Sequence, residues 1–126
     1  MLRPRALDHV GLIVTDMDRS LRFYEALGLE LLRLKGPNAD GVRTAVLRVG
    51  DQELNVFSDP SFSASGNGER IHHFCFAMEC TDIADLVSAL ERAGIEIAKG
   101  PIERRDGTSL FVSDPDGVRV ELIVKK

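Results

Sequence analysis

An internal repeat constrains this 126-residue chain more than any other feature of its sequence. Two pairs of segments match at an offset of 66 residues and a third pair at 64: 26–30 with 92–96, 54–57 with 120–123, and 8–10 with 72–74. A two-residue insertion near Glu79 and Cys80 accounts for the change of offset. The chain is therefore expected to fold as two copies of one unit.

The first half has the periodicity of a strand, a helix and three further strands. The apolar run at 7–14 predicts a strand, and either Asp16 or Asp18 caps a helix that ends near Leu27, before Gly28. Further strands are expected at about 29–34, 44–49 and 52–57.

The second half repeats this order. A strand is expected at 71–78, a helix begins after the capping residue Asp82, and Gly94 ends that helix. The remaining strands are expected at about 96–98, 109–113 and 118–124, with a tight turn at 114–117.

These patterns predict an α+β fold in which two tandem βαβββ modules form a curved mixed sheet around a cavity. Module one spans about 6–58, a linker rich in Ser, Gly and Asn spans 59–70, and module two spans about 71–126. The whole chain, 1–126, is expected to be a single domain, because a chain of this length can bury about two thirds of its unfolded surface.

Alternation along the strands separates core residues from residues on the opposite face. In the first, fourth, fifth and last strands, alternate apolar residues mark the face that packs against the helix. The opposite face then carries polar residues at four positions that the repeat makes equivalent in pairs: His9 with His73, and Asn55 with Glu121. These side chains are expected to line the cavity.

The four positions include a 2-His-1-carboxylate set. Such a set binds a divalent metal and leaves coordination positions open for a substrate. The predicted ligands are His9, His73 and Glu121, and an ordinary surface role for each is the competing interpretation. His72 is the rival of His73, but it shares the strand parity of the core residue Phe74, so we interpret it as a rim residue.

The net charge of −4 argues against a nucleic-acid partner, because phosphate binding needs a concentrated basic face. The basic pairs are interpreted as solvated surface charge. They are Arg3 with Arg5, Arg104 with Arg105, and Lys125 with Lys126.

No membrane association is expected, since no apolar run approaches the roughly 20 residues of a spanning helix. Cys75 and Cys80 lack a CxxC spacing and would point to opposite faces of a strand, so no disulfide is expected. Together with the absence of a signal sequence, this favours a cytoplasmic location.

Two stretches of the sequence carry a family signature. The first consists of LDHVGL at 7–12, DMDRSLRFY at 16–24 and LGL at 27–29, and the second of FVSDPDGVRVEL at 111–122. In order and spacing they resemble the opening and the ending of vicinal oxygen chelate proteins, the superfamily of glyoxalases, bleomycin-resistance proteins and extradiol dioxygenases.

The resemblance implies metal-dependent chemistry on a small molecule. In this superfamily a divalent metal chelates two neighbouring oxygens of a substrate and stabilises the negative charge that develops there. Members isomerise hemithioacetals, epimerise acyl thioesters, cleave catechols or open an epoxide antibiotic, and others bind drugs without metal. The resemblance places the ligands at His9, His73 and Glu121, and Fe, Mn, Zn, Ni and Co all suit such ligands.

Asn55 departs from one branch of the family. Glyoxalase and epimerase members carry a carboxylate at this fourth position, and an amide cannot act as a general base. Glu53 lies about 6–7 Å further along the same strand face and is the candidate substitute. Glu53 and Asn55 are therefore the candidates for a catalytic role, and the departure favours dioxygenase-like cleavage slightly over glyoxalase-like isomerisation.

Four residues are candidates for the wall of a substrate pocket: Asn55, Phe57, Cys75 and Phe111. Core packing is the alternative for the two aromatic residues, and inert burial is the alternative for Cys75.

Three functions follow from these observations. The first is a metal-dependent enzyme, the second a metal-free drug-binding protein of the bleomycin-resistance type, and the third a regulatory or structural subunit that kept the ligands. Family precedent implies a homodimer, in which the ligands of one site come from one chain or from both.

Overall fold

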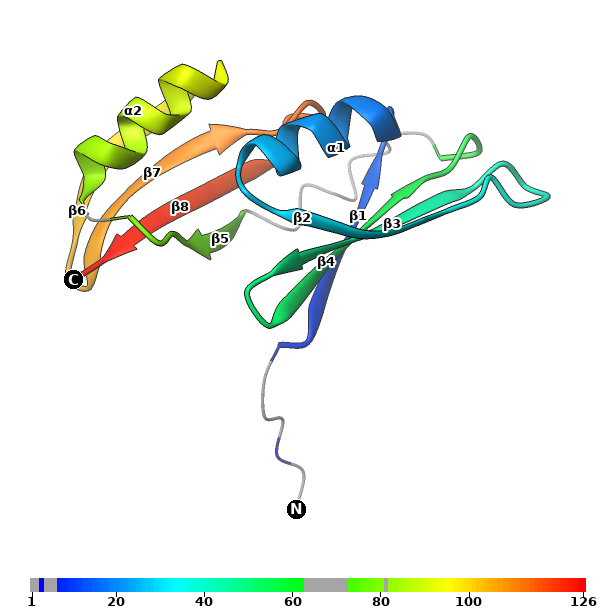
Figure 1. Ribbon diagram of the computed structural model, residues 1–126, viewed down its shortest axis with the longest axis horizontal. Helices are drawn as coiled ribbons and strands as arrows, with labels where there is room; N and C mark the ends of the chain where they lie inside the picture. Colours follow the sequence, from blue (N-terminus) through cyan, green and yellow to red (C-terminus); the bar gives the residue numbers. More distant parts are fainter. Residues whose placement is uncertain (1–2, 4–6, 63–72, 81) are drawn as a thin grey trace. The chain divides into compact units, whose positions relative to one another are not determined.

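The computed structural model describes residue 3 and residues 7–62, 73–80 and 82–126. It divides the chain into two compact units, Met1–Ser63 and Ala64–Lys126 (Figure 1). Within the described ranges, each unit contains one α-helix and one four-stranded mixed sheet. The predicted α+β fold and the division into two similar halves are confirmed.

The first unit consists of β1 (His9–Val14), α1 (Met17–Ala26), β2 (Glu30–Lys35), β3 (Arg43–Val49) and β4 (Gln52–Ser58). The strand order in its sheet is β1-β4-β3-β2, with β1 parallel to β4 and the other pairs antiparallel. These elements agree with the predicted ones to within about two residues at each end.

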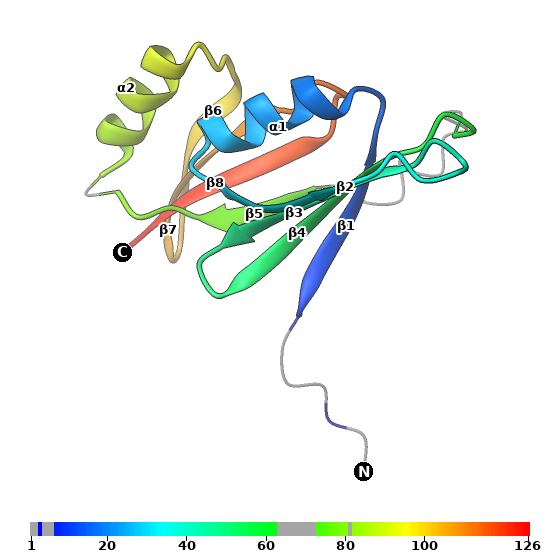
Figure 2. The ribbon, with the colours of Figure 1, turned by 45° about the vertical axis from the view of Figure 1, so that its right-hand side comes forward.

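The second unit consists of β5 (Phe74–Ala77), α2 (Ile83–Ala93), β6 (Ile97–Arg104), β7 (Gly107–Ser113) and β8 (Arg119–Lys125). Its strand order, β5-β8-β7-β6, is the same as in the first unit. The neighbours β7 and β8 lie side by side in both ribbon views (Figure 1 and Figure 2). The βαβββ order predicted for each half is therefore confirmed.

Equivalent strands pair in the same register in the two sheets. Gly11 pairs with Asn55 across β1 and β4, and Cys75 pairs with Glu121 across β5 and β8. The offsets of 64 and 66 residues that relate the two halves convert the first pair into the second. Each predicted histidine ligand comes two residues before the first member of its pair, so both histidines fall on the same face of their strands.

The helix ends follow the predicted capping chemistry. The side chain of Asp16 accepts a hydrogen bond of 3.0 Å from the backbone N–H three residues on, which identifies Asp16 rather than Asp18 as the first N-cap. Asp82 does the same for α2 at 2.9 Å. Gly94 ends α2 with a φ of 72°, a left-handed conformation that glycine adopts without steric cost.

The core includes residues on the predicted face of β4, β5 and β8, but Ile123 of β8, which alternation places on the opposite face, is buried as well. The largest fully buried side chains are those of Tyr24, Leu47, Leu54, Leu86, Leu110 and Leu122. In β8, Val120 and Leu122 are buried while Glu121 between them is half-buried. The alternation that placed the polar residues away from the core is thus confirmed in this strand.

One predicted strand was wrong in its extent. The strand expected at 96–98 continues to Arg104, through Gly100 and Pro101. β6 is the edge strand of its sheet, and an edge position tolerates a proline because the missing N–H faces away from the ladder. The pairing with β7 shifts register between Lys99 and Ile102, and the added residues bring Arg104 opposite Gly107.

Part of the predicted linker, residues 63–70, and the rim residue His72 lie outside the described residues. Both described cysteines, Cys75 and Cys80, are free thiols, as predicted. Neither helix of the described chain has the length and apolar character needed to cross a bilayer.

Candidate metal centre

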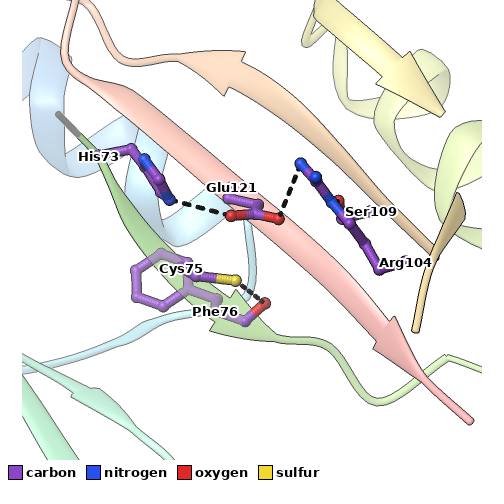
Figure 3. A network of polar contacts seen from close by, with 6 residues as sticks. All are labelled: His73, Cys75, Phe76, Arg104, Ser109 and Glu121. Atoms are coloured by element: carbon purple, nitrogen blue, oxygen red, sulfur yellow. Dashed lines mark hydrogen bonds and ion pairs between the residues drawn. The ribbon is translucent and has the colours of Figure 1, made fainter. Parts of the chain in front are cut away.

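The second unit brings two of the three predicted metal ligands into contact. The Nε2 atom of His73 lies 3.1 Å from Oε1 of Glu121 (Figure 3). His73 directly precedes β5, and Glu121 lies in β8, the parallel neighbour of β5. The side chain of Glu121 is 12% exposed and that of His73 is 34% exposed, so both are partly withdrawn from solvent.

Arg104 is a residue of this site that sequence reasoning missed. Its Nη2 lies 3.8 Å from Oε2 of Glu121, and its Nε donates a hydrogen bond of 3.1 Å to Oγ of Ser109 (Figure 3). From the sequence, the pair Arg104 and Arg105 is interpreted as solvated surface charge, because it lies beside Asp106 and Gly107. A predicted strand that continued through Pro101 would have included Arg104 in the sheet. Arg104 could then have been identified as a candidate neighbour of Glu121.

The surface interpretation does hold for a second basic residue, Lys125. Its ammonium pairs with the carboxylate of Asp106, and both side chains are more than half exposed. The hydrogen bond from Lys125 lowers the pKa of Asp106 below its usual value, and the same bond raises the pKa of Lys125. This pair ties the β6–β7 turn to the end of β8.

Two predicted pocket residues flank Glu121 on the neighbouring strands. Cys75 is its register partner on β5, and Phe111 is its register partner on β7. The ring of Phe111 is buried and packs edge-on against the ring of His73, with 5.4 Å between the ring centroids. Phe111 therefore supports the orientation of the imidazole in addition to packing in the core.

Cys75 is a weak candidate for chemistry. Although the residue is exposed overall, desolvation of its thiol raises the pKa of Cys75 to about 11, and the negative charge of Glu121 adds to this effect. The thiol is therefore neutral at pH 7, and its closest recorded contact is a long 3.7 Å hydrogen bond to the carbonyl oxygen of Phe76. An inert wall residue is the role that fits these observations.

The first unit places the remaining predicted residues on one face of its sheet. Pairing of β1 with β4 puts His9 beside Glu53, and puts Phe57 on the same face further along β4. The side chain of His9 is 49% exposed, and its Nδ1 lies 2.9 Å from Oδ2 of Asp8. The imidazole of His9 is thus accessible, and Asp8 holds it through Nδ1. The second ring nitrogen, Nε2, lies on the opposite side of the ring from this contact.

Asn55 is the most unusual polar residue of this face. Its Oδ1 is buried and has no hydrogen-bond partner in the part of the chain that the structure describes. Leaving a buried acceptor unpaired costs about 1–3 kcal/mol, so such atoms often indicate a water, an ion or a ligand. Asn55 occupies the position that the repeat makes equivalent to Glu121.

The structure therefore brings together His73 and Glu121, and it places His9 in the other unit, against Asp8. Within each unit, the described residues hold no group of three or more His, Cys, Asp and Glu side chains that would bind a metal. The complete set of three ligands stays a prediction.

The residues present fit a divalent metal. In the second unit, an imidazole nitrogen of His73 faces a carboxylate oxygen of Glu121. Imidazole nitrogen and carboxylate oxygen are both donors that first-row divalent metals accept. The donor chemistry of the site thus agrees with that of a metal centre.

Comparison with known proteins agrees with this architecture. A family model described as "Glyoxalase/Bleomycin resistance protein/Dioxygenase superfamily" matches residues 6–122. The match includes both repeats and ends just after Glu121, so it covers every predicted ligand and pocket position.

Three similar proteins illustrate the relationship. Virulence protein STM3117 of Salmonella typhimurium is 31% identical over 92% of this chain and 81% of its own length, and its crystal structure has a TM-score of 0.74. A probable lactoylglutathione lyase of Synechocystis is 30% identical, over 91% of this chain and 92% of that protein. The crystal structure of a glyoxalase family protein from Enterococcus faecalis has a TM-score of 0.76 at 26% identity, over 94% of this chain and 97% of that one.

The family model spans most of the chain, and the repeated βαβββ units have the folds of solved family members. The chain therefore belongs to the glyoxalase/bleomycin resistance protein/dioxygenase superfamily.

Proposed function

We propose that this chain is a divalent-metal-dependent enzyme whose small substrate chelates the metal through two neighbouring oxygens. His9, His73 and Glu121 are the proposed metal ligands. The observation that carries the proposal is the 3.1 Å approach of His73 Nε2 to Glu121 Oε1. A histidine beside a glutamate is common in proteins, but this contact falls on two positions that strand parity and the repeat single out independently.

Two observations in the first unit support the third ligand. His9 has the same place relative to the Gly11–Asn55 pair as His73 has relative to the Cys75–Glu121 pair. The unpaired Oδ1 of Asn55 on the same face is an acceptor that a substrate hydroxyl would satisfy.

A divalent metal at this site would supply Lewis acidity, stabilising negative charge that develops on the substrate oxygens. The residues of the chain provide the remaining functions. The ring of Phe111 packs edge-on against the ring of His73 and so supports the orientation of this imidazole. Glu53, beside His9, is the proposed proton acceptor, because the amide of Asn55 cannot take up a proton.

We favour isomerase or lyase chemistry for the reaction. A relative that is 30% identical over nearly its whole length is named a probable lactoylglutathione lyase, which supports this class. The names of the relatives above give no support to the dioxygenase-like cleavage that the sequence analysis favoured. A homodimer and a cytoplasmic location, both expected from the sequence, are part of the proposal.

Metal analysis tests the proposal directly. Untagged protein purified without oxygen should contain close to one divalent metal ion per chain, or metal-free protein should take up that amount on titration. Folded protein that neither contains nor takes up a divalent metal would contradict the proposal. Titration with bleomycin would then test the metal-free drug-binding alternative.

The reaction class is tested on metal-loaded protein with a hemithioacetal made from a 2-oxoaldehyde and a thiol, assayed without oxygen. Turnover that falls in Glu53→Gln while metal content is unchanged would support isomerase or lyase chemistry with Glu53 as the base. Oxygen consumption with a catechol, and no turnover of the hemithioacetal, would instead support cleavage.

A further inference from the structure

We propose that Arg104 is a positioning residue of the metal centre. Anchored by Ser109, it draws one carboxylate oxygen of Glu121 toward itself and leaves the other oxygen facing His73, so that Glu121 binds a metal through a single oxygen. This inference rests on the proposed metal-dependent function and adds a residue that determines the geometry of the site.

The first step of the argument is the division of the Glu121 carboxylate between two neighbours. Oε1 lies 3.1 Å from Nε2 of His73, whereas Oε2 lies 3.8 Å from Nη2 of Arg104 (Figure 3). The second distance is too long for a hydrogen bond, but it is a close contact of opposite charges. Since only 12% of the Glu121 side chain is exposed, water screens this attraction less than it would at an open surface.

The second step is the anchor of the guanidinium group. The Arg104 side chain is 41% exposed, and a long exposed side chain does not hold one geometry through a single ion pair. Its Nε, however, donates a 3.1 Å hydrogen bond to Oγ of Ser109, a residue with no exposed surface. Because the guanidinium group is planar and rigid, fixing Nε restricts the direction in which Nη2 points.

The third step excludes nearby acidic residues as the groups that orient Arg104. In the described part of the β6–β7 hairpin, Asp106 pairs with Lys125 and Glu103 accepts a 3.3 Å hydrogen bond from the hydroxyl of Thr108. Arg104 forms an ion pair with Glu121 and donates a hydrogen bond to Ser109. These two residues therefore orient its guanidinium group.

Charge and position predict opposite effects of Arg104 on metal affinity. A cation near the site repels a divalent metal, so removing a bare charge would raise the affinity. Groups that orient a ligand have the reverse effect, since their loss typically costs 10- to 100-fold in metal affinity. The sign of the change therefore distinguishes a positioning role from a background charge.

The experiment titrates metal-free protein with Co(II) in competition with a chelator and records the visible absorption of the bound ion. Arg104→Lys keeps the charge but lacks the Nε–H that binds Ser109, and Ser109→Ala removes the anchor alone. We expect each variant to bind Co(II) about 10-fold more weakly than wild type and to change the absorption of the bound ion. Arg92→Gln is the control, because it removes a positive charge from an exposed residue in the last turn of α2, outside the sheet that contains Glu121, and it should not weaken binding.

Wild-type affinity and an unchanged Co(II) spectrum in both Arg104→Lys and Ser109→Ala would overturn the inference and leave the proposed function standing. Failure of the wild-type protein to bind Co(II) or any other divalent metal would overturn both. Thermal unfolding of the metal-free variants is the check that weaker binding does not come from a misfolded chain.

Discussion

Cys75 and Glu121 are direct neighbours in the parallel ladder of β5 and β8. This pairing determines which histidine meets the carboxylate, because His73 lies two residues before Cys75 and so points to the same face. A slip of one residue would turn each side chain of β5 to the opposite face of the sheet. The contact between His73 and Glu121 thus depends on register, and the predictions for metal binding depend on it too.

Replacement of either ligand of the second unit should weaken metal binding by more than about 100-fold, beyond the 10- to 100-fold typical of groups around a ligand. The variants are His73→Gln and Glu121→Gln, which keep approximate size and replace the imidazole or carboxylate donor by the weaker oxygen of a neutral amide. Metal affinity by chelator competition is the measurement. His72→Gln is the matched control, and a similar loss in that variant would show that strand parity selected the wrong histidine.

Asn55→Leu should not destabilise the metal-free protein. The buried Oδ1 of Asn55 makes no hydrogen bond within the described chain, so exchanging the amide for an apolar group removes an uncompensated desolvation cost. The free energy of unfolding, from urea titration, should stay equal or rise by up to about 1 kcal/mol.

Asp114→Ala is the contrasting variant. The buried carboxylate of Asp114 accepts two backbone hydrogen bonds of 2.8 Å, from Asp116 and Val118, so its loss should cost about 2–4 kcal/mol. Equal destabilisation by Asn55→Leu would mean that the Asn55 amide has a structural partner.

Gly107→Ala should destabilise the second unit by about 1–3 kcal/mol, the range typical of overpacking. A Cβ atom at this buried position would lie 2.3 Å from the carbonyl oxygen of Val124, a backbone atom that cannot move without shifting β8. Urea titration measures the effect. Gly11→Ala is the control, since its added Cβ would meet only a side-chain atom of Phe57, at 3.5 Å, and equal losses in the two variants would argue against close strand approach as the cause.

The Asp106–Lys125 pair should make a small, pH-dependent contribution to stability. The pKa of Asp106 is lowered in the folded protein, so its contribution is present above the unfolded value of about 3.9 and is lost as the pH falls through the lower folded value. The pKa of Lys125 is raised, so its contribution is present below about pH 10.4 and is lost as the pH rises further.

Thermal unfolding of wild type and Asp106→Asn should therefore differ slightly at pH 7 and converge at about pH 2. The difference should be small because both side chains are exposed. A difference of the same size at both pH values would mean that the effect of the substitution does not come from the ionised carboxylate.

Local rules predicted much of the fold. Strand alternation put Glu121 on the face opposite Val120 and Leu122, and the structure has it there. The capping preferences of aspartate and glycine predicted where α2 begins and ends, at Asp82 and Gly94. These features depend on neighbours a few residues apart, which the sequence displays directly.

The sequence by itself determined the repeat, the order of the elements and the positions of the candidate ligands, because side-chain periodicity and helix capping are local properties. Only the tertiary structure decided that β6 continues through Pro101 and that Arg104, held by Ser109, lies beside Glu121. The physical reason is that the edge position of β6 and its shifted register against β7 depend on pairing between strands, which no local pattern along the chain specifies.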